Sequence, residues 1–127
     1  MKRHRILVVE DDPPTLASIR DLFRRAGFEV DTATTGRDAL GLLLDGELPS
    51  AVVLDSRMPV MGGEELVSII RGYSRLAHLP VLVLTACDTA PAFARSVEAV
   101  MRKPFRAEDL IASVETLLTS RSPQSAP

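Results

Sequence analysis

Residues 5–12 read RILVVEDD, a short apolar run that ends in three consecutive acids. Residues 51–55, AVVLD, and residues 80–85, PVLVLT, repeat this pattern of an apolar run that closes on a polar side chain. Continuous apolar runs of this length are typical of strands that are covered on both faces, as in parallel sheets. The sequence therefore predicts a parallel sheet whose strands end in polar residues.

Weaker strands and amphipathic helices are expected between these runs. Residues 28–32 and 97–101 are mixed in polarity, which suits the edges of a sheet. Between successive strands, apolar side chains recur at helical spacing in four sets: Leu16, Ile19, Leu22, Phe23 and Ala26; Ala39, Leu40, Leu43 and Leu44; Leu66, Ile69, Ile70 and Tyr73; and Leu110, Ile111, Val114, Leu117 and Leu118. Gly27 is a suitable stop for the first helix. A further helix at residues 90–96 is short, because Pro91 suits only a first turn.

Regular alternation of strand and helix predicts the α/β fold class: a five-stranded parallel sheet of the flavodoxin-like type, with helices on both faces and a shortened fourth helix. Right-handed crossovers leave few topologies, and we predict the strand order 2-1-3-4-5. This order places ligands at the carboxyl ends of strands 1 and 3. Residues 1–119 are expected to form one domain. Residues 120–127 have no apolar face and are expected to be a disordered tail or the stub of a linker.

Composition excludes several classes of protein. The chain has 127 residues, of which 46% are hydrophobic and 25% charged, as in ordinary globular domains. The net charge of -2 gives no support for nucleic-acid binding, and no run approaches the ~20 apolar residues of a membrane-spanning helix. The apolar run after the basic start is too short for a secretory signal, so a cytoplasmic location is expected. The single cysteine, Cys87, excludes an internal disulfide and is interpreted as a small packing residue.

Polar residues follow four of the predicted strands. Glu10 and Asp11 follow the first, Asp55 the third and Lys103 the fifth, while Thr85 ends the fourth. Each has a plain structural explanation when it is taken alone, since acids favour helix starts and a lysine can serve as an ion-pair partner. Together they place acids, a hydroxyl and a cation at one edge of the sheet. Clustered carboxylates repel one another, and a divalent cation such as Mg²⁺ relieves that repulsion.

Four stretches resemble the signatures of response-regulator receiver domains, the switch modules of two-component signalling. They are ILVVEDD at residues 6–12, LDSRMPVMGG at residues 54–63, LTA at residues 84–86 and KPF at residues 103–105. The resemblance implies a receiver that takes a phosphoryl group from a sensor histidine kinase or a histidine phosphotransfer protein. Mg²⁺, with Mn²⁺ as a possible substitute, would assist, and phosphorylation would switch the binding of an unidentified output partner. Neither nucleic acid nor a membrane is an expected partner of this domain.

The resemblance assigns the phosphoacceptor to Asp55. It assigns the metal ligands to Glu10, Asp11, Asp55 and the Arg57 backbone carbonyl; the switch to Thr85, Ala86 and Lys103; and structural roles to Met58, Pro59, Gly63 and Pro104, the last after a cis peptide bond. Asp12 lies one place beyond the acidic pair and is expected to cap a helix. Such a domain catalyses its own phosphorylation and slow dephosphorylation, and is a signalling module rather than an enzyme.

The sequence departs from the family at Val100, where a tyrosine or phenylalanine is usual. Coupling through a threonine–aromatic pair is therefore not expected, and residues 86–97 are predicted to become ordered or to shift instead. One alternative is an atypical receiver that binds partners without being phosphorylated. An aspartate-nucleophile phosphatase would need an Asp-x-Asp pattern after the first strand, which residues 10–13 do not match. A flavin carrier would need a Ser/Thr/Gly-rich loop at the same place.

Overall fold

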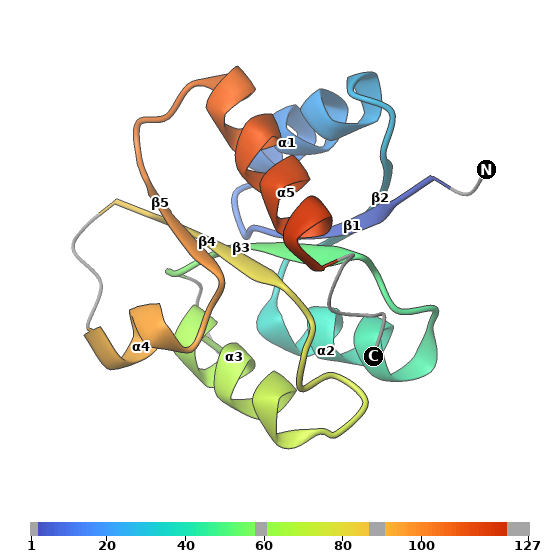
Figure 1. The fold of residues 1–127 in the computed structure, drawn as a ribbon, viewed down its shortest axis with the longest axis vertical. Helices are drawn as coiled ribbons and strands as arrows, with labels where there is room; N and C mark the ends of the chain where they lie inside the picture. Colours follow the sequence, from blue (N-terminus) through green and yellow to red (C-terminus); the bar gives the residue numbers. More distant parts are fainter. Residues whose placement is uncertain (1–2, 58–60, 87–90, 122–127) are drawn as a thin grey trace.

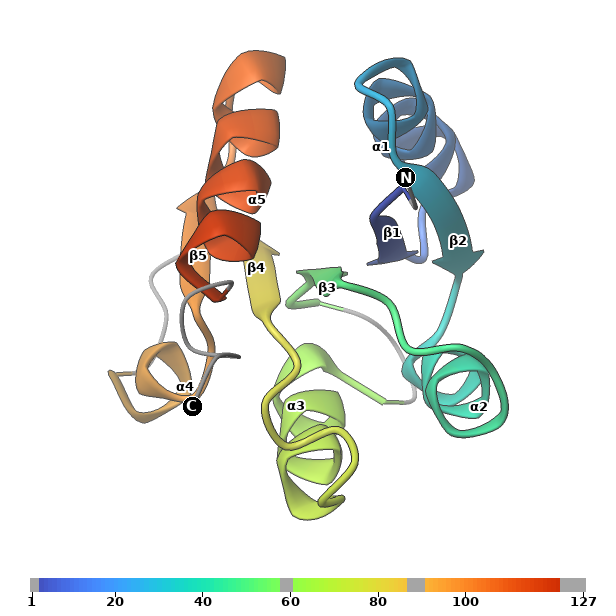
Figure 2. The same ribbon diagram turned by 45° about the vertical axis from the view of Figure 1, so that its right-hand side comes forward.

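The computed structural model describes residues 3–57, 61–86 and 91–121 of the chain. The elements in chain order are β1 (Arg5–Val9), α1 (Pro13–Arg25), β2 (Glu29–Ala33), α2 (Gly36–Asp45), β3 (Ala51–Asp55), α3 (Gly63–Gly72), β4 (Val81–Thr85), α4 (Pro91–Arg95), β5 (Ala99–Arg102) and α5 (Ala107–Arg121). The five strands form one parallel sheet in the order β2-β1-β3-β4-β5, which confirms the predicted fold class and topology. Helices α1 and α5 lie on one face of the sheet and α2, α3 and α4 on the other (Figures 1 and 2).

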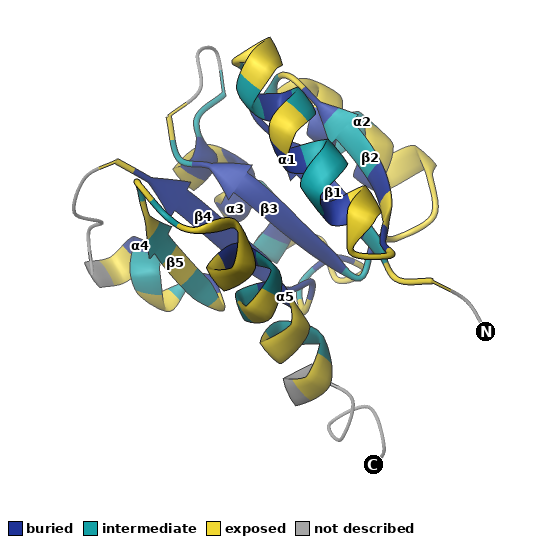
Figure 3. Ribbon diagram, turned by 90° about the horizontal axis from the view of Figure 1, so that it is seen from above, coloured by how far each residue is buried: buried dark blue, intermediate teal, exposed yellow. Residues whose placement is uncertain are grey.

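The two faces of the sheet form two separate hydrophobic cores, because side chains alternate across a strand. In β1, Ile6 and Val8 belong to the core beneath α1 and α5, whereas Leu7 and Val9 belong to the core beneath α2, α3 and α4. Strands β3 and β4 are buried along their whole length, while β5 keeps alternate residues exposed (Figure 3). The continuous apolar runs of the sequence are therefore the central strands, and the mixed run of β5 is an edge.

Local sequence determines where α1 begins. The carboxylate of Asp12 accepts a hydrogen bond from the backbone N–H of Thr15 at 3.1 Å, which satisfies one of the free donors at the helix start. Pro13 and Pro14 occupy the first two helical positions, where a backbone donor is not needed. The hydrogen bonds from Thr15 also lower the pKa of Asp12. Asp12 thus caps α1, which confirms the prediction made from the sequence.

Local sequence also determines where α1 ends. Gly27 has a φ of 99°, and its N–H donates to the carbonyl of Arg24 at 3.0 Å. The N–H of Phe28 donates to the carbonyl of Phe23 at 3.1 Å, and together these bonds form a Schellman motif. The Phe28 ring packs edge-on against the Phe23 ring, with centroids 5.7 Å apart. Phe28 therefore belongs to the helix terminus, and the prediction that β2 begins there is wrong by one residue.

Several other predicted details are wrong for reasons of packing. Val97 was expected in the fifth strand but is buried in the core beneath α2, α3 and α4, so β5 begins only at Ala99. The third helix ends at Gly72, which leaves Tyr73 exposed outside its apolar stripe. Leu44 is also exposed, although it was expected to face the core.

The fourth helix is short as predicted, with five residues. Helix α5 continues to Arg121, two residues beyond the predicted domain boundary at residue 119. The remainder of the predicted tail, residues 122–127, lies outside the described residues. Among the residues that the structure describes, no helix combines the length and the apolar character needed to cross a membrane.

Candidate functional site

The parallel strands bring their carboxyl ends to one edge of the sheet. Strand pairing places Asp55 beside Leu84 and Thr85 beside Arg102. The backbone N–H of Lys103 donates to the carbonyl of Thr85 at 2.8 Å, which ties the end of β5 to the end of β4. Thr85 is only 3% exposed, so its hydroxyl group is held close to the interior of this edge.

Three carboxylates converge at this edge. Each of Glu10, Asp11 and Asp55 offers an oxygen atom that lies within 4.8 Å of the other two. Glu10 and Asp55 are buried, with 3% and 7% of their surfaces exposed. This confirms the prediction that the residues after strands 1 and 3 meet, and Asp12 is not part of the cluster.

Lys103 is the cation that faces this cluster. Its Nζ lies 3.7 Å from Oδ1 of Asp55 and 3.9 Å from Oε1 of Glu10. Both distances are too long for a direct hydrogen bond, so the ammonium group balances the carboxylates without closing on either of them. Among the described residues, the ammonium group of Lys103 faces three carboxylates, and these four groups together carry a net negative charge when all three carboxylates are ionised.

The carboxylate of Glu10 is held in an unfavourable environment for a negative charge. Burial raises the pKa of Glu10 to about 7, and the neighbouring Asp55 and Asp11 carboxyl groups act in the same direction. The Asp12 N–H donates to Oε2 of Glu10 at 3.2 Å and partly opposes that rise. Within the described part of the chain, the buried Oε1 of Glu10 has no hydrogen-bond partner. A buried, unsatisfied carboxylate oxygen beside two more carboxylates fits a hard divalent cation such as Mg²⁺.

The loop after β3 orients Asp55. The Arg57 N–H donates to Oδ1 of Asp55 at 3.2 Å, and the Gly63 N–H donates to the carbonyl of Ser56 at 3.3 Å. A Cβ atom on Gly63 would lie 3.0 Å from Cα of Ser56 and 3.3 Å from the carbonyl oxygen of Asp55. The start of α3 can therefore approach the end of β3, with Asp55, this closely only because residue 63 is glycine.

The remaining predicted residues have different outcomes. The Lys103–Pro104 peptide bond is cis, as predicted. Ala86 is exposed, directly after β4, and Val100 is 39% exposed on the edge strand. Met58, Pro59 and Cys87 lie outside the described residues.

Three residues that hold neighbouring segments together, Met61, Arg71 and Arg75, were not predicted to have a role. Met61 packs against the core, and a Cβ atom on Gly36 would lie 2.9 Å from it, so the start of α2 supports the loop after β3. Arg71 and Arg75 hold backbone carbonyl groups of neighbouring segments. Met61 stands inside the LDSRMPVMGG stretch and could have been found there, whereas nothing in the sequence around the two arginines signals their contacts.

Comparison with known proteins identifies the family. The model of the response regulator receiver domain matches residues 6–115. The transcriptional regulatory protein PrrA of Mycobacterium tuberculosis is 38% identical over 121 residues, which cover 92% of this chain and 51% of PrrA. The chain thus spans about half the length of the curated relatives it matches.

Solved structures of response regulators have the same fold as this chain. A putative response regulator from Chloroflexus aurantiacus matches with a TM-score of 0.85 at 30% identity, over 93% of this chain and 99% of that one. The response regulator TrrA from Thermotoga maritima, solved in complex with Mg²⁺–BeF, matches with a TM-score of 0.82 at 28% identity, over 90% and 98% of the two chains. The chain belongs to the receiver domains of two-component response regulators, and Glu10, Asp11 and Asp55 form its acidic pocket.

Proposed function

We propose that Asp55 accepts a phosphoryl group and that its phosphorylation switches the binding of a partner. The convergence of Glu10, Asp11 and Asp55 within 4.8 Å, opposite the ammonium group of Lys103, is the observation that carries this proposal. The Asp55 carboxylate is buried, oriented by the Arg57 N–H and flanked by a cation. These are the properties that a positioned oxygen nucleophile requires.

Mg²⁺, or Mn²⁺ in its place, would be held by Glu10, Asp11, Asp55 and the backbone carbonyl of Arg57. The bound ion supplies positive charge that neutralises the phosphoryl oxygens as they approach the carboxylates. The Mg²⁺–BeF complex of the similar regulator TrrA supports this assignment. Without such an ion, the ammonium group of Lys103 would face three carboxylates and the incoming phosphoryl group.

The residues of this chain then have distinct tasks. An Asp55 carboxylate oxygen forms a bond to phosphorus while the bond between phosphorus and the donor histidine nitrogen breaks. The transition state of such a transfer is loose, so positioning and charge neutralisation contribute most of the catalysis. Lys103 pairs with the phosphoryl group, and the Thr85 hydroxyl and the Ala86 N–H donate to its oxygens. Attack of water on phosphorus later releases phosphate and restores the carboxylate.

The donor is a sensor histidine kinase or a histidine phosphotransfer protein, and the exchange takes place in the cytoplasm. A groove between α1 and the segment before α5 begins beside the site, because Lys103 lines it together with Ile19, Leu22 and Phe105. An apolar groove of this kind suits a helix of the donor protein. The output partner is unidentified, and the net charge of the chain gives no support for direct binding to nucleic acid.

Acetyl phosphate tests the acceptor. The wild-type protein with Mg²⁺ should gain one phosphoryl group by intact-mass measurement, and removal of the metal with a chelator should prevent the gain. Asp55→Asn should gain none. Asp45→Asn, which changes an exposed carboxylate at the end of α2, should be labelled like the wild type. Undiminished labelling of Asp55→Asn would contradict the proposal, and the absence of labelling in the wild type would favour the phosphorylation-independent alternative.

A further inference from the structure

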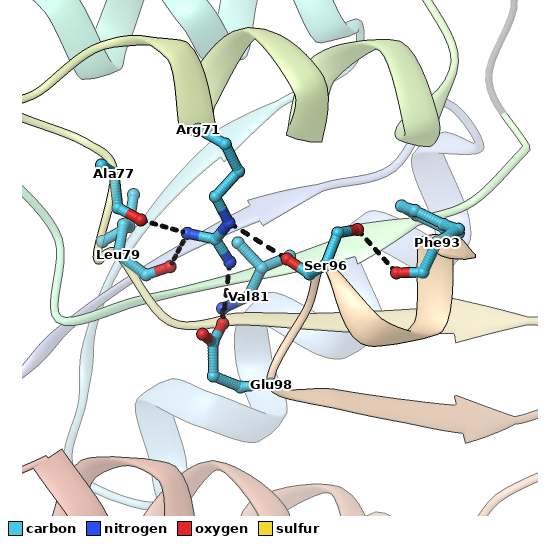
Figure 4. Close-up of polar contacts among 7 residues, drawn as sticks. All are labelled: Arg71, Ala77, Leu79, Val81, Phe93, Ser96 and Glu98. Atoms are coloured by element: carbon cyan, nitrogen blue, oxygen red, sulfur yellow. Dashed lines mark hydrogen bonds and ion pairs between the residues drawn. The ribbon is translucent and has the colours of Figure 1, made fainter. Parts of the chain in front are cut away.

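One arginine joins four separate segments at the edge of the sheet opposite the acidic pocket (Figure 4). Arg71, near the end of α3, donates through Nη1 to the carbonyl groups of Ala77 and Leu79 at 3.1 and 2.8 Å. Its Nε donates to the carbonyl of Ser96 at 3.0 Å, and its Nη2 donates to Oε1 of Glu98 at 3.0 Å. We call these contacts the Arg71 clamp. They connect α3, the loop before β4, the turn after α4 and the residue before β5.

Glu98 extends the clamp into the sheet. Its Oε1 also accepts the backbone N–H of Val81 at 2.7 Å, and its own N–H donates to the carbonyl of Val81 at 3.0 Å. The first residue pair of β4 and β5 is Leu82 with Ala99, one place further along. The Glu98 carboxylate therefore takes the position that a strand carbonyl would occupy if β5 began earlier. Arg71 holds that carboxylate in place with a charge-assisted hydrogen bond.

The short α4 helix depends on such external contacts. A helix of five residues cannot be stable by itself, because nucleation costs more than one turn of hydrogen bonds returns. Phe93 and Val97 are buried against the core, and Ser96 donates to the carbonyl of Phe93 through both its N–H and its hydroxyl group. Ser96 and Val97 follow the carboxyl-terminal end of α4, which the clamp holds, whereas Phe93 lies in the middle of the helix and Ala92 near its other end is exposed.

Hydrogen bonds hold strand β5 to β4 at both of its ends. Its carboxyl end is tied to β4 by the bond from the Lys103 N–H to the Thr85 carbonyl at 2.8 Å, and its start is tied by Glu98. We propose that Arg71 is the fixed pivot of residues 91–98. A displacement that starts at Thr85 swings the amino-terminal end of α4, while Ser96 and Glu98 stay in place. The contacts of the Arg71 clamp do not involve Asp55. Only the proposal that phosphorylation causes the swing of α4 rests on the proposed function.

Amide hydrogen exchange in the unphosphorylated protein tests the clamp. Arg71→Met should speed exchange at the Val81, Ser96 and Glu98 amides by about tenfold or more, because the lost bonds are charge-assisted. Arg71→Lys should behave in the same way, since one ammonium group cannot serve acceptors spread around a planar guanidinium group.

Arg75→Met is the matched control for this experiment. Arg75 donates to the carbonyl groups of Leu43, Leu44 and Gly46 at 3.1, 3.4 and 3.0 Å, so it holds the end of α2 instead. Its loss should leave the Val81, Ser96 and Glu98 amides at wild-type rates. Urea unfolding of each variant separates local from global effects. If Arg71→Met accelerates exchange equally throughout both cores, Arg71 stabilises the fold as a whole and the proposal of a pivot is wrong.

Addition of Mg²⁺ and beryllofluoride, observed by NMR, tests the swing. In the wild type, the Ala92 and Phe93 amide resonances should shift while those of Ser96 and Glu98 stay in place, and in Arg71→Met all four should shift. Equal shifts of all four amides in the wild type would overturn the pivot. The absence of any shift around Asp55 would contradict the proposed function instead, and the exchange rates of the free variants decide the clamp independently.

Discussion

Glu10 is buried beside two other carboxylates, and burial raises its pKa to about 7 from an ordinary value of 4.5. Between these two pH values the folded protein holds a proton that the unfolded chain has released. The unfolding free energy of the metal-free protein should therefore fall as the pH rises from about 4.5 to about 7, and it should not recover above that window. The ionised Glu10, a proposed metal ligand, thus destabilises the metal-free fold.

Glu10→Gln should remove this penalty. At pH 8 with a chelator present, the variant should be more stable than the wild type by up to about 3 kcal/mol, since each pKa unit corresponds to about 1.4 kcal/mol. At pH 4 the gain should vanish, because the wild-type carboxyl group is then protonated in both the folded and the unfolded protein. Urea unfolding at the two pH values measures the difference, and a gain of equal size at both would show that ionisation of Glu10 is not its cause.

Asp11 should be needed for metal binding. In the wild type, Mg²⁺ at about ten times its dissociation constant should raise the unfolding free energy by about 1.4 kcal/mol. Asp11→Ala should lose most of that gain and most of the labelling by acetyl phosphate. Asp12→Ala is the control, because Asp12 caps α1 through Thr15 and lies outside the cluster. It should lower stability and still respond to Mg²⁺, and an unchanged response of Asp11→Ala to the metal would refute the coordination.

Among the elements, the junction of β3 and α3 is the most sensitive to a small change. Gly63→Ala would place a Cβ atom 3.0 Å from Cα of Ser56, so the end of β3 and the loop after it must shift. Overpacking of this kind should cost about 1–3 kcal/mol of stability and slow the labelling of Asp55. Gly72→Ala, at the end of the same helix, meets nothing within 4 Å and should leave labelling unchanged. Normal labelling of Gly63→Ala would show that the close approach does not position Asp55.

The sequence predicts the elements well where one local rule governs them. Apolar runs covered on both faces predict β1, β3 and β4, and the acid-capped, glycine-terminated pattern predicts α1. It fails where a distant contact decides. Val97 and Glu98 look like the start of a strand. In the structure, Val97 packs into the core beneath α2, α3 and α4, and the Glu98 carboxylate accepts hydrogen bonds from Val81 and Arg71. Neither contact leaves a trace in the residues next to them.

For the whole molecule, the site could be predicted because its residues follow strands that the topology brings side by side. The adjacent pair Glu10 and Asp11 is far in the chain from Asp55 and from Lys103, yet all four converge once the strand order is known. The Arg71 clamp could not be predicted in this way, because its acceptors are mostly carbonyl groups of irregular segments. The positions of those carbonyl groups exist only in the folded chain.

The central claim is that Asp55 itself carries the phosphoryl group, and chemical trapping tests it most directly. The protein is phosphorylated with acetyl phosphate and Mg²⁺ and then reduced with borohydride, which converts an aspartyl phosphate to homoserine. Peptide sequencing by mass spectrometry should find homoserine at position 55 and aspartate at positions 11 and 12. Homoserine at position 11 or 12, or its absence from position 55 in a labelled protein, would contradict the account.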